Sequence, residues 1–89
     1  MVPQFCLAHK NLADVYAIEK NYKKAEEAFK RALSFCPFYQ ESQYKLAIVL
    51  MKEGDTKVAR SELQKLIQRN RVGPYVDRSQ EALKYLVKE

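Results

Sequence analysis

The two cysteines and the single histidine, Cys6, Cys36 and His9, are the first side chains to consider for metal binding or nucleophilic attack. A structural zinc site needs four ligands, and a catalytic thiol needs a base that a third group orients. Cys6 and His9 are three residues apart, so any helix would bring them together and their proximity does not indicate a catalytic pair. No Asp or Glu stands at a spacing that would place it to orient His9. The two glycines form no phosphate-cradling loop. We therefore expect no catalytic residue, no metal site and no cofactor, so the chain is not expected to be an enzyme.

The composition is typical of one small globular domain. The chain has 89 residues and a mass of 10.4 kDa, with 47% hydrophobic and 30% charged residues. Its longest apolar run, residues 46–51, is far shorter than the roughly 20 residues that span a bilayer. No charged start followed by an apolar stretch stands at the N-terminus. We expect neither a membrane span nor a signal peptide.

Helical periodicity is clearest over residues 25–36, where apolar residues recur at the spacing of one helix face. Pro37 ends this helix, because proline disfavours helical geometry in the residue before it. An earlier amphipathic helix begins near Pro3, where a first-turn proline costs nothing. Asn21 separates the two helices and is expected to cap the second. The first part of the chain is therefore a helical hairpin.

The same organisation continues downstream. Gly54 ends a third helix, since glycine suits the left-handed position after a helix, and Asp55 is expected to cap a fourth. A fifth helix runs over about 75–87, after a Gly-Pro pair. No stretch alternates with the period of a strand, so the fold is predicted to be all-α.

The sequence repeats itself at an offset of 34 residues. This offset aligns both helices and the turn between them: Leu12 with Leu46, Ala13 with Ala47, Val15 with Val49, Glu19 with Glu53, Lys23 with Lys57, Ala25 with Ala59, Phe29 with Leu63 and Leu33 with Ile67. A helix pair that recurs with this period cannot bury its apolar faces alone and is typical of a stacked solenoid.

The residues of the repeat resemble a known family. The first unit has the order Leu12-Ala13-x-x-Tyr16, then Ala25, Phe29, Ala32 and Pro37, and the second has Leu46-Ala47-x-x-Leu50, Gly54-Asp55, Ala59, Leu63 and Leu66. This order is similar to the tetratricopeptide repeat. The resemblance implies a right-handed α-α superhelix, or solenoid, of two helix pairs plus a C-terminal capping helix. We divide the single domain 1–89 into repeats at about 6–39 and 40–73 and a terminal helix at about 75–87.

The resemblance also implies a function, a non-catalytic scaffold or adaptor that binds a peptide or helix of a partner protein and no small-molecule substrate. The partner would lie in a concave groove lined by the first helix of each pair. The first unit would contribute Leu7, Lys10, Asp14 and Ala17, and the second Glu41, Tyr44, Ile48 and Met51. The terminal helix would add Val76, Ser79, Leu83 and Leu86.

Some members of this family capture a C-terminal carboxylate with a lysine and an asparagine in the groove. Lys10 stands at a fitting position, but Asp14 stands where the uncharged amide is needed. Because one carboxylate repels another, we expect this binding mode to be absent.

Two alternatives remain open for the partner. Phe5, Ala8 and Val15 lie on the face of the first helix that would touch a preceding repeat, which indicates either a piece of a longer array or a homo-oligomer formed through this face. The net charge of +5 arises mostly from residues 45–89. A minor alternative is therefore nucleic-acid binding. Its residues would be Lys65, Arg69, Arg71, Arg78, Lys84 and Lys88, with Tyr75 and Tyr85 as stacking groups.

The two cysteines have two interpretations. As buried free thiols they would act as small hydrophobic residues, which is the favoured interpretation and agrees with a cytoplasmic protein. Alternatively, Cys6 opens the first helix and Cys36 closes its antiparallel partner, so a disulfide between them is geometrically feasible. A disulfide would indicate an oxidising compartment such as a periplasm.

Overall fold

The computed structural model describes residues 3–70 and 72–87 and contains five helices. They are α1 (Gln4–Ile18), α2 (Tyr22–Phe35), α3 (Gln40–Lys52), α4 (Thr56–Arg69) and α5 (Pro74–Val87). These two ranges contain no strand, so the predicted all-α helical solenoid is confirmed. Within the same residues, no helix has both the length and the apolar character that a membrane span requires.

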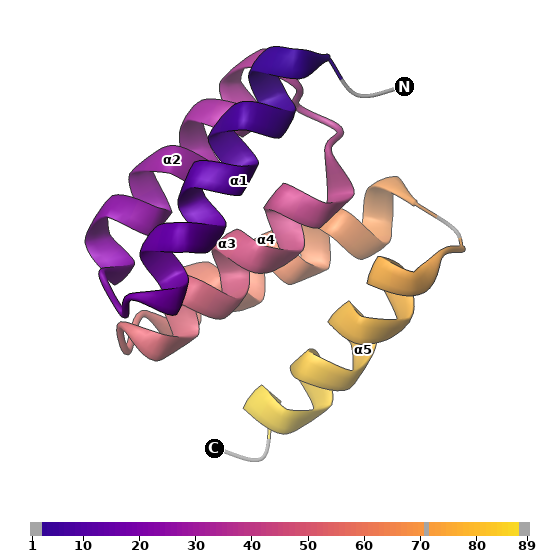
Figure 1. Cartoon of the computed structure of the whole chain (residues 1–89). Coiled ribbons are helices and arrows are strands. Elements are labelled where there is room, and N and C mark those ends of the chain that lie inside the picture. The colour runs from indigo at the N-terminus through magenta and orange to yellow at the C-terminus, as the bar shows by residue number, and fades with distance from the viewer. Residues whose placement is uncertain (1–2, 71, 88–89) are drawn as a thin grey trace.

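The helices form two antiparallel pairs and one additional helix. Figure 1 shows α1 and α2 on one side, α3 and α4 in the middle, and α5 alone on the other side. Contacts join α1 to α2, α2 to α3, α3 to α4 and α4 to α5. Each element therefore packs mainly on its neighbours in the chain, as expected of a stack of repeated units.

The turns inside the two pairs have the same hydrogen bonds. In the first, the N–H groups of Lys20 and Asn21 donate to the carbonyls of Ala17 and Tyr16 over 3.0 and 2.8 Å. In the second, 34 residues later, those of Gly54 and Asp55 donate to Met51 and Leu50 over 3.0 and 2.9 Å. This pattern is the Schellman motif, which places a residue in the left-handed region after the helix. That residue is Lys20 at φ 63° and Gly54 at φ 88°.

The predicted side-chain caps at Asn21 and Asp55 are wrong in one respect. Both residues occupy the N-cap position, and their carbonyls accept from the N–H groups of Ala25 and Ala59. Neither side chain makes a cap hydrogen bond. Their ψ angles of 73° and 67° are smaller than those of an ordinary extended N-cap. The Schellman turn therefore fixes the entry into the second helix of each pair.

The core repeats with the same offset as the turns. Ala13 and Ala47 are fully buried at the closest approach of the helices, and Phe29 and Leu63 fill the space beside them. Ala25, Ala59, Ala32 and Leu66 are also fully buried. Small residues allow the helices of a pair to approach, and the larger ones fill the remaining volume.

The repeat breaks at one surface. Leu46 and Val49 are each only 3% exposed because α3 packs on the first pair. Their equivalents Leu12 and Val15 are 45% and 51% exposed. The outer side of α1 thus corresponds to the face of α3 that packs on the first pair, but no helix covers it among the described residues.

The terminal helix has the predicted capping position, but its predicted groove residues do not line a groove. Val76, Ser79 and Leu86 are 3%, 0% and 2% exposed, so they belong to the packed interior and not to a groove surface. Leu83 is half-buried and packs against the core. The terminal helix uses these side chains to cover the second pair, because that pair also has an apolar face to bury.

Cys6 and Cys36 form a disulfide, so the favoured interpretation of two free thiols is wrong. Their Cα atoms are 6.2 Å apart, within the normal range for this bond. Cys6 lies in the first turn of α1 and is fully buried, and Cys36 is the C-cap of α2. The bond therefore joins the start of α1 to the end of α2.

Candidate functional site

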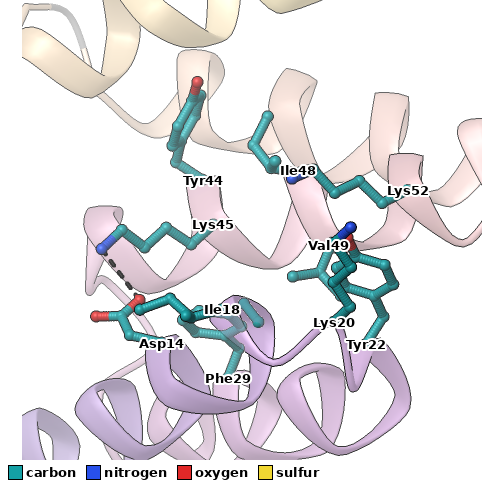
Figure 2. Close-up of a pocket in the computed structure, with 11 residues that line it drawn as sticks. Asp14, Ile18, Lys20, Tyr22, Phe29, Tyr44, Lys45, Ile48, Val49 and Lys52 are labelled. Atoms are coloured by element: carbon teal, nitrogen blue, oxygen red, sulfur yellow. Dashed lines mark hydrogen bonds and ion pairs between the residues drawn. The ribbon is translucent and has the colours of Figure 1, made fainter.

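An open groove of about 710 Å³ lies between the first pair and α3. Figure 2 shows Ile18 and Phe29 on the side of the first pair, and Tyr44 and Ile48 extending from α3 on the other side. The Tyr44 ring lies 5.7 Å from the ring of Tyr75 on α5. The groove is lined by Asp14, Ala17, Ile18, Lys20, Tyr22, Phe29, Tyr44, Lys45, Ile48, Val49 and Lys52. It is apolar in the middle and carries charged side chains at both ends.

Half of the predicted groove residues line this groove. Asp14, Ala17, Tyr44 and Ile48 do so, each half-buried.

The other four predicted residues do not line its wall. Leu7 is exposed on α1, and Met51 packs against the core. Lys10 and Glu41 pair with charged groups next to the groove, where they hold its wall in place. Whether any of the eight residues contacts a partner stays a prediction.

Four charged side chains form a closed ring between α1 and α3. Lys10 Nζ lies 3.2 Å from Asp14 Oδ2 and 3.1 Å from Glu41 Oε2. Lys45 Nζ lies 3.1 Å from Asp14 Oδ1 and 2.9 Å from the same Glu41 oxygen. Two positive and two negative charges thus cancel at this end of the groove. The ring also links the first repeat unit to the second.

The ring shifts the pKa values of Lys10, Lys45 and Glu41 in the direction that favours their charged forms. Burial by itself lowers the pKa of Lys10 and of Lys45, but hydrogen bonds and charge attraction to Glu41 and Asp14 outweigh it and raise both. Burial likewise raises the pKa of Glu41, and the two lysines outweigh that effect and lower it. All three groups are therefore stabilised in their charged forms.

Several groove residues lie beyond the predicted set. Lys45 and Lys52 continue the helical stripe through Glu41 and Ile48, so extending that spacing along α3 finds them. Ile18 follows Asp14 by one turn of α1 in the same way. Tyr22 and Phe29 come from the second helix of the pair and depend on tertiary packing. No periodicity within a single helix indicates them.

The predicted self-association face is exposed. Phe5 and Val15 are 71% and 51% exposed, and Ala8 is also exposed. The Phe5 ring lies 5.9 Å from the ring of Phe35, which extends the apolar surface onto α2. A second hollow of about 410 Å³ lies beside it, lined by His9, Leu12, Tyr16, Lys24, Glu27, Ala28 and Arg31.

Several cations of the predicted basic end are engaged with other groups. Arg69 stacks on Phe38 and donates to the carbonyl of Pro37, while Arg78 stacks on Tyr75. Lys65 pairs with Glu62. Tyr85 and Lys84 are exposed on α5. Arg71 and Lys88 lie outside the described residues. The cations that the structure places are spread over two helices and partly engaged.

The repeat geometry agrees with a family match. Residues 6–39 match the model of the family described as Tetratricopeptide repeat. The match covers the first helix pair and supports a tetratricopeptide repeat there. No curated protein matches the chain. Tetratricopeptide repeats are generally protein–protein interaction modules and typically non-catalytic scaffolds, so the family indicates a protein partner.

Proposed function

We propose that this chain is an interaction module that holds a peptide or helix of a partner protein in the groove between the first pair and α3. The observation that carries the proposal is the groove itself, in which Ile18 is exposed and Ile48 is half-buried between charged side chains. Tyrosine is favoured at the centre of protein interfaces, and Tyr44 lies half-buried at the edge of this groove. The general role of the family supports the same assignment.

The test removes apolar side chains that line the groove, and circular dichroism checks that the variant still folds. The double variant Tyr44→Ala, Ile48→Ala should lose at least about tenfold in affinity for peptides selected from a random library on the wild-type protein. Affinity is measured by fluorescence anisotropy. The matched control is Val58→Ala with Tyr85→Ala, which truncates exposed apolar residues of similar size on α4 and α5. Equal affinity of the groove variant and the control would contradict the proposal.

A second candidate function is self-association through the outer side of α1. Phe5, Ala8, Leu12 and Val15 follow one another at intervals of three and four residues, which is the spacing of a seam that packs against another helix. Their counterparts on α3 lie at the interface with the first pair. An apolar face of this kind is normally covered in a folded protein.

The arrangement of the helices favours a two-fold contact for this second candidate. In a head-to-tail contact, the second helix of a pair in one copy would cover α1 of another copy. Here α3 already covers α2 and α5 already covers α4, so neither second helix is free for that contact. Two copies would instead pair α1 against α1. Sedimentation over a concentration series should then show a dimer that Val15→Asp converts to a monomer. A monomer at all concentrations would remove this candidate.

The disulfide supports an oxidising compartment such as a periplasm as the place where the chain works. Thiols in growing cells can be trapped with an alkylating polyethylene glycol reagent before lysis. We expect no mass increase without reductant and two added groups after reduction. Two added groups without reductant would mean that both cysteines are free thiols in the cell, which would indicate a reducing compartment.

A further inference from the structure

We propose that the groove selects a partner segment in which a large apolar side chain is followed or preceded within a few residues by a carboxylate. This inference rests on the proposed function and names the chemistry of its partner. It is carried by the way charge is distributed around the apolar floor.

One end of the groove is electrically balanced. Asp14 and Lys45 lie there, inside the ring that they form with Lys10 and Glu41. Each carboxylate of the ring already lies within 3.2 Å of two ammonium groups. Asp14, the acidic residue that lines the groove, therefore has its charge matched by Lys10 and Lys45 and does not repel an acidic ligand.

The other end carries two lysines without such compensation. Figure 2 shows Lys20, Tyr22 and Lys52 gathered there, across the floor from Asp14. Neither Lys20 nor Lys52 forms an ion pair with a carboxylate among the described residues. Lys52 Nζ lies 5.8 Å from the centre of the Tyr22 ring, a contact that positions the ammonium group and leaves its charge unneutralised. This end is therefore a positive site beside an apolar one.

The apolar floor fixes where the carboxylate would lie. Ile18, Phe29 and Ile48 occupy the middle of the groove, between the balanced end and the lysine end. An apolar anchor on this floor leaves the next few residues of a partner at one end or the other. An acidic residue of the partner is attracted by the two lysines at that end, whereas a basic residue is repelled by them.

This site differs from a carboxylate clamp built on the helix that carries Lys10. Lys10 is 9% exposed and its ammonium group is held by Asp14 and Glu41. The cations available to a ligand instead come from the turn after α1 and from the last residue of α3. The inference therefore depends on Lys20 and Lys52 and not on Lys10.

The experiment uses the random peptide library selected on the wild-type chain. We expect the selected peptides to combine a large apolar residue with Asp or Glu nearby. Binding should weaken when sodium chloride is raised from roughly 0.05 to 0.5 M, because exposed charges are screened. The variant Lys20→Gln, Lys52→Gln should bind these peptides about fivefold or more weakly.

The matched control is Lys57→Gln with Lys84→Gln, which removes the same charge from exposed lysines of α4 and α5. It should bind like the wild type. Selection of neutral or basic peptides, or equal affinity of the two lysine variants, overturns the inference. If such peptides still depend on Tyr44 and Ile48, the proposed function stands while the acidic preference fails. If the library yields no peptide that depends on those two residues, both fail.

Discussion

Lys20 holds a backbone conformation that a side chain disfavours. It lies at φ 63°, in the position that Gly54 fills in the second turn at φ 88°. For residues other than glycine this region costs about 1–2 kcal/mol, since Cβ approaches the following carbonyl. The equivalence of the two turns shows that the fold demands this conformation whichever residue is present. A lysine here is therefore retained at a cost in stability, beside the groove that it lines.

Replacing Lys20 with glycine should raise the free energy of unfolding by about 1 kcal/mol, because the strain at this φ disappears. Urea titration followed by circular dichroism measures the change. The control is Glu19→Gly, since Glu19 lies at φ −76° and gains nothing from glycine. The reciprocal change Gly54→Ala should destabilise, although no atom lies within 4 Å of the added Cβ. A loss of stability in Lys20→Gly would contradict this account.

Ser42 places a hydroxyl in the interior without a partner. Its side chain is fully buried, and its Oγ has no hydrogen-bond partner within the described residues. Because a buried unpaired hydroxyl costs free energy, Ser42→Ala should stabilise the chain by about 1 kcal/mol in thermal or urea unfolding. Ser79 is the control, since its equally buried hydroxyl donates to the carbonyl of Tyr75 over 2.6 Å. Ser79→Ala should give no such gain, and equal effects of the two changes would refute the reasoning.

At the scale of elements, the ionic ring joins two helices that belong to different repeat units. Glu41 of α3 lies against Lys10 of α1, and Asp14 of α1 against Lys45 of α3. The lowered pKa of Glu41 means that its contribution to stability is complete above 4.5, the ordinary pKa of a glutamate side chain, and is lost as pH falls through the folded value. The raised pKa values of the lysines mean that their contributions are present below 10.5 and are lost above it, as pH rises through the folded values.

The variant Glu41→Gln should therefore lose about 1 kcal/mol of stability near pH 7, because both lysines lose a charged partner. The difference from wild type should shrink as pH is lowered well below 4.5, where the wild-type carboxylate becomes protonated. Urea midpoints across this range measure it. Glu81→Gln serves as the control because Glu81 is exposed on α5. A difference from wild type that is constant with pH would exclude the ring as its cause.

The sequence predicts the helices better than it predicts the groove. Pro37 and Gly54 mark helix ends through local backbone chemistry, and the offset of 34 residues indicates the stacking of units. The turn at Lys20 carries no glycine, so only its equivalence to Gly54 reveals it. Half of the predicted groove residues line the groove because helical spacing identifies one face of one helix. Tyr22 and Phe29 enter it from a second helix, which spacing within one helix does not specify.

The terminal helix and the cysteines illustrate a similar limit. The spacing of Val76 and Leu86 is compatible with a face that lines a groove and with a face that is buried. Both side chains are buried because α5 packs on the second pair. Cys6 and Cys36 are 30 residues apart in sequence, which neither requires nor excludes a bond. The antiparallel pairing of α1 and α2 brings them together.

At the scale of the whole molecule, the disulfide should be the largest single contribution to stability. It closes a loop with a sequence separation of 30 residues, for which the chain-entropy estimate is roughly 3–4 kcal/mol. Reduction of the wild type should therefore lower Tm by roughly 15 °C or more. The control is the variant Cys6→Ala, Cys36→Ala, whose Tm should be low and insensitive to reductant. A wild-type Tm unchanged by reductant would contradict this assignment.

The disulfide is also placed asymmetrically. It fastens the first pair, whereas the second pair and α5 are held only by non-covalent contacts with their neighbours. In a stack where each layer touches only the adjacent ones, fluctuations begin at the end that is not fastened. The groove shares its walls between the fastened pair and α3, so one wall is anchored while the other belongs to the half that opens first. A bound segment bridging both walls would therefore slow amide hydrogen exchange in α3 and α4 more than in α1 and α2.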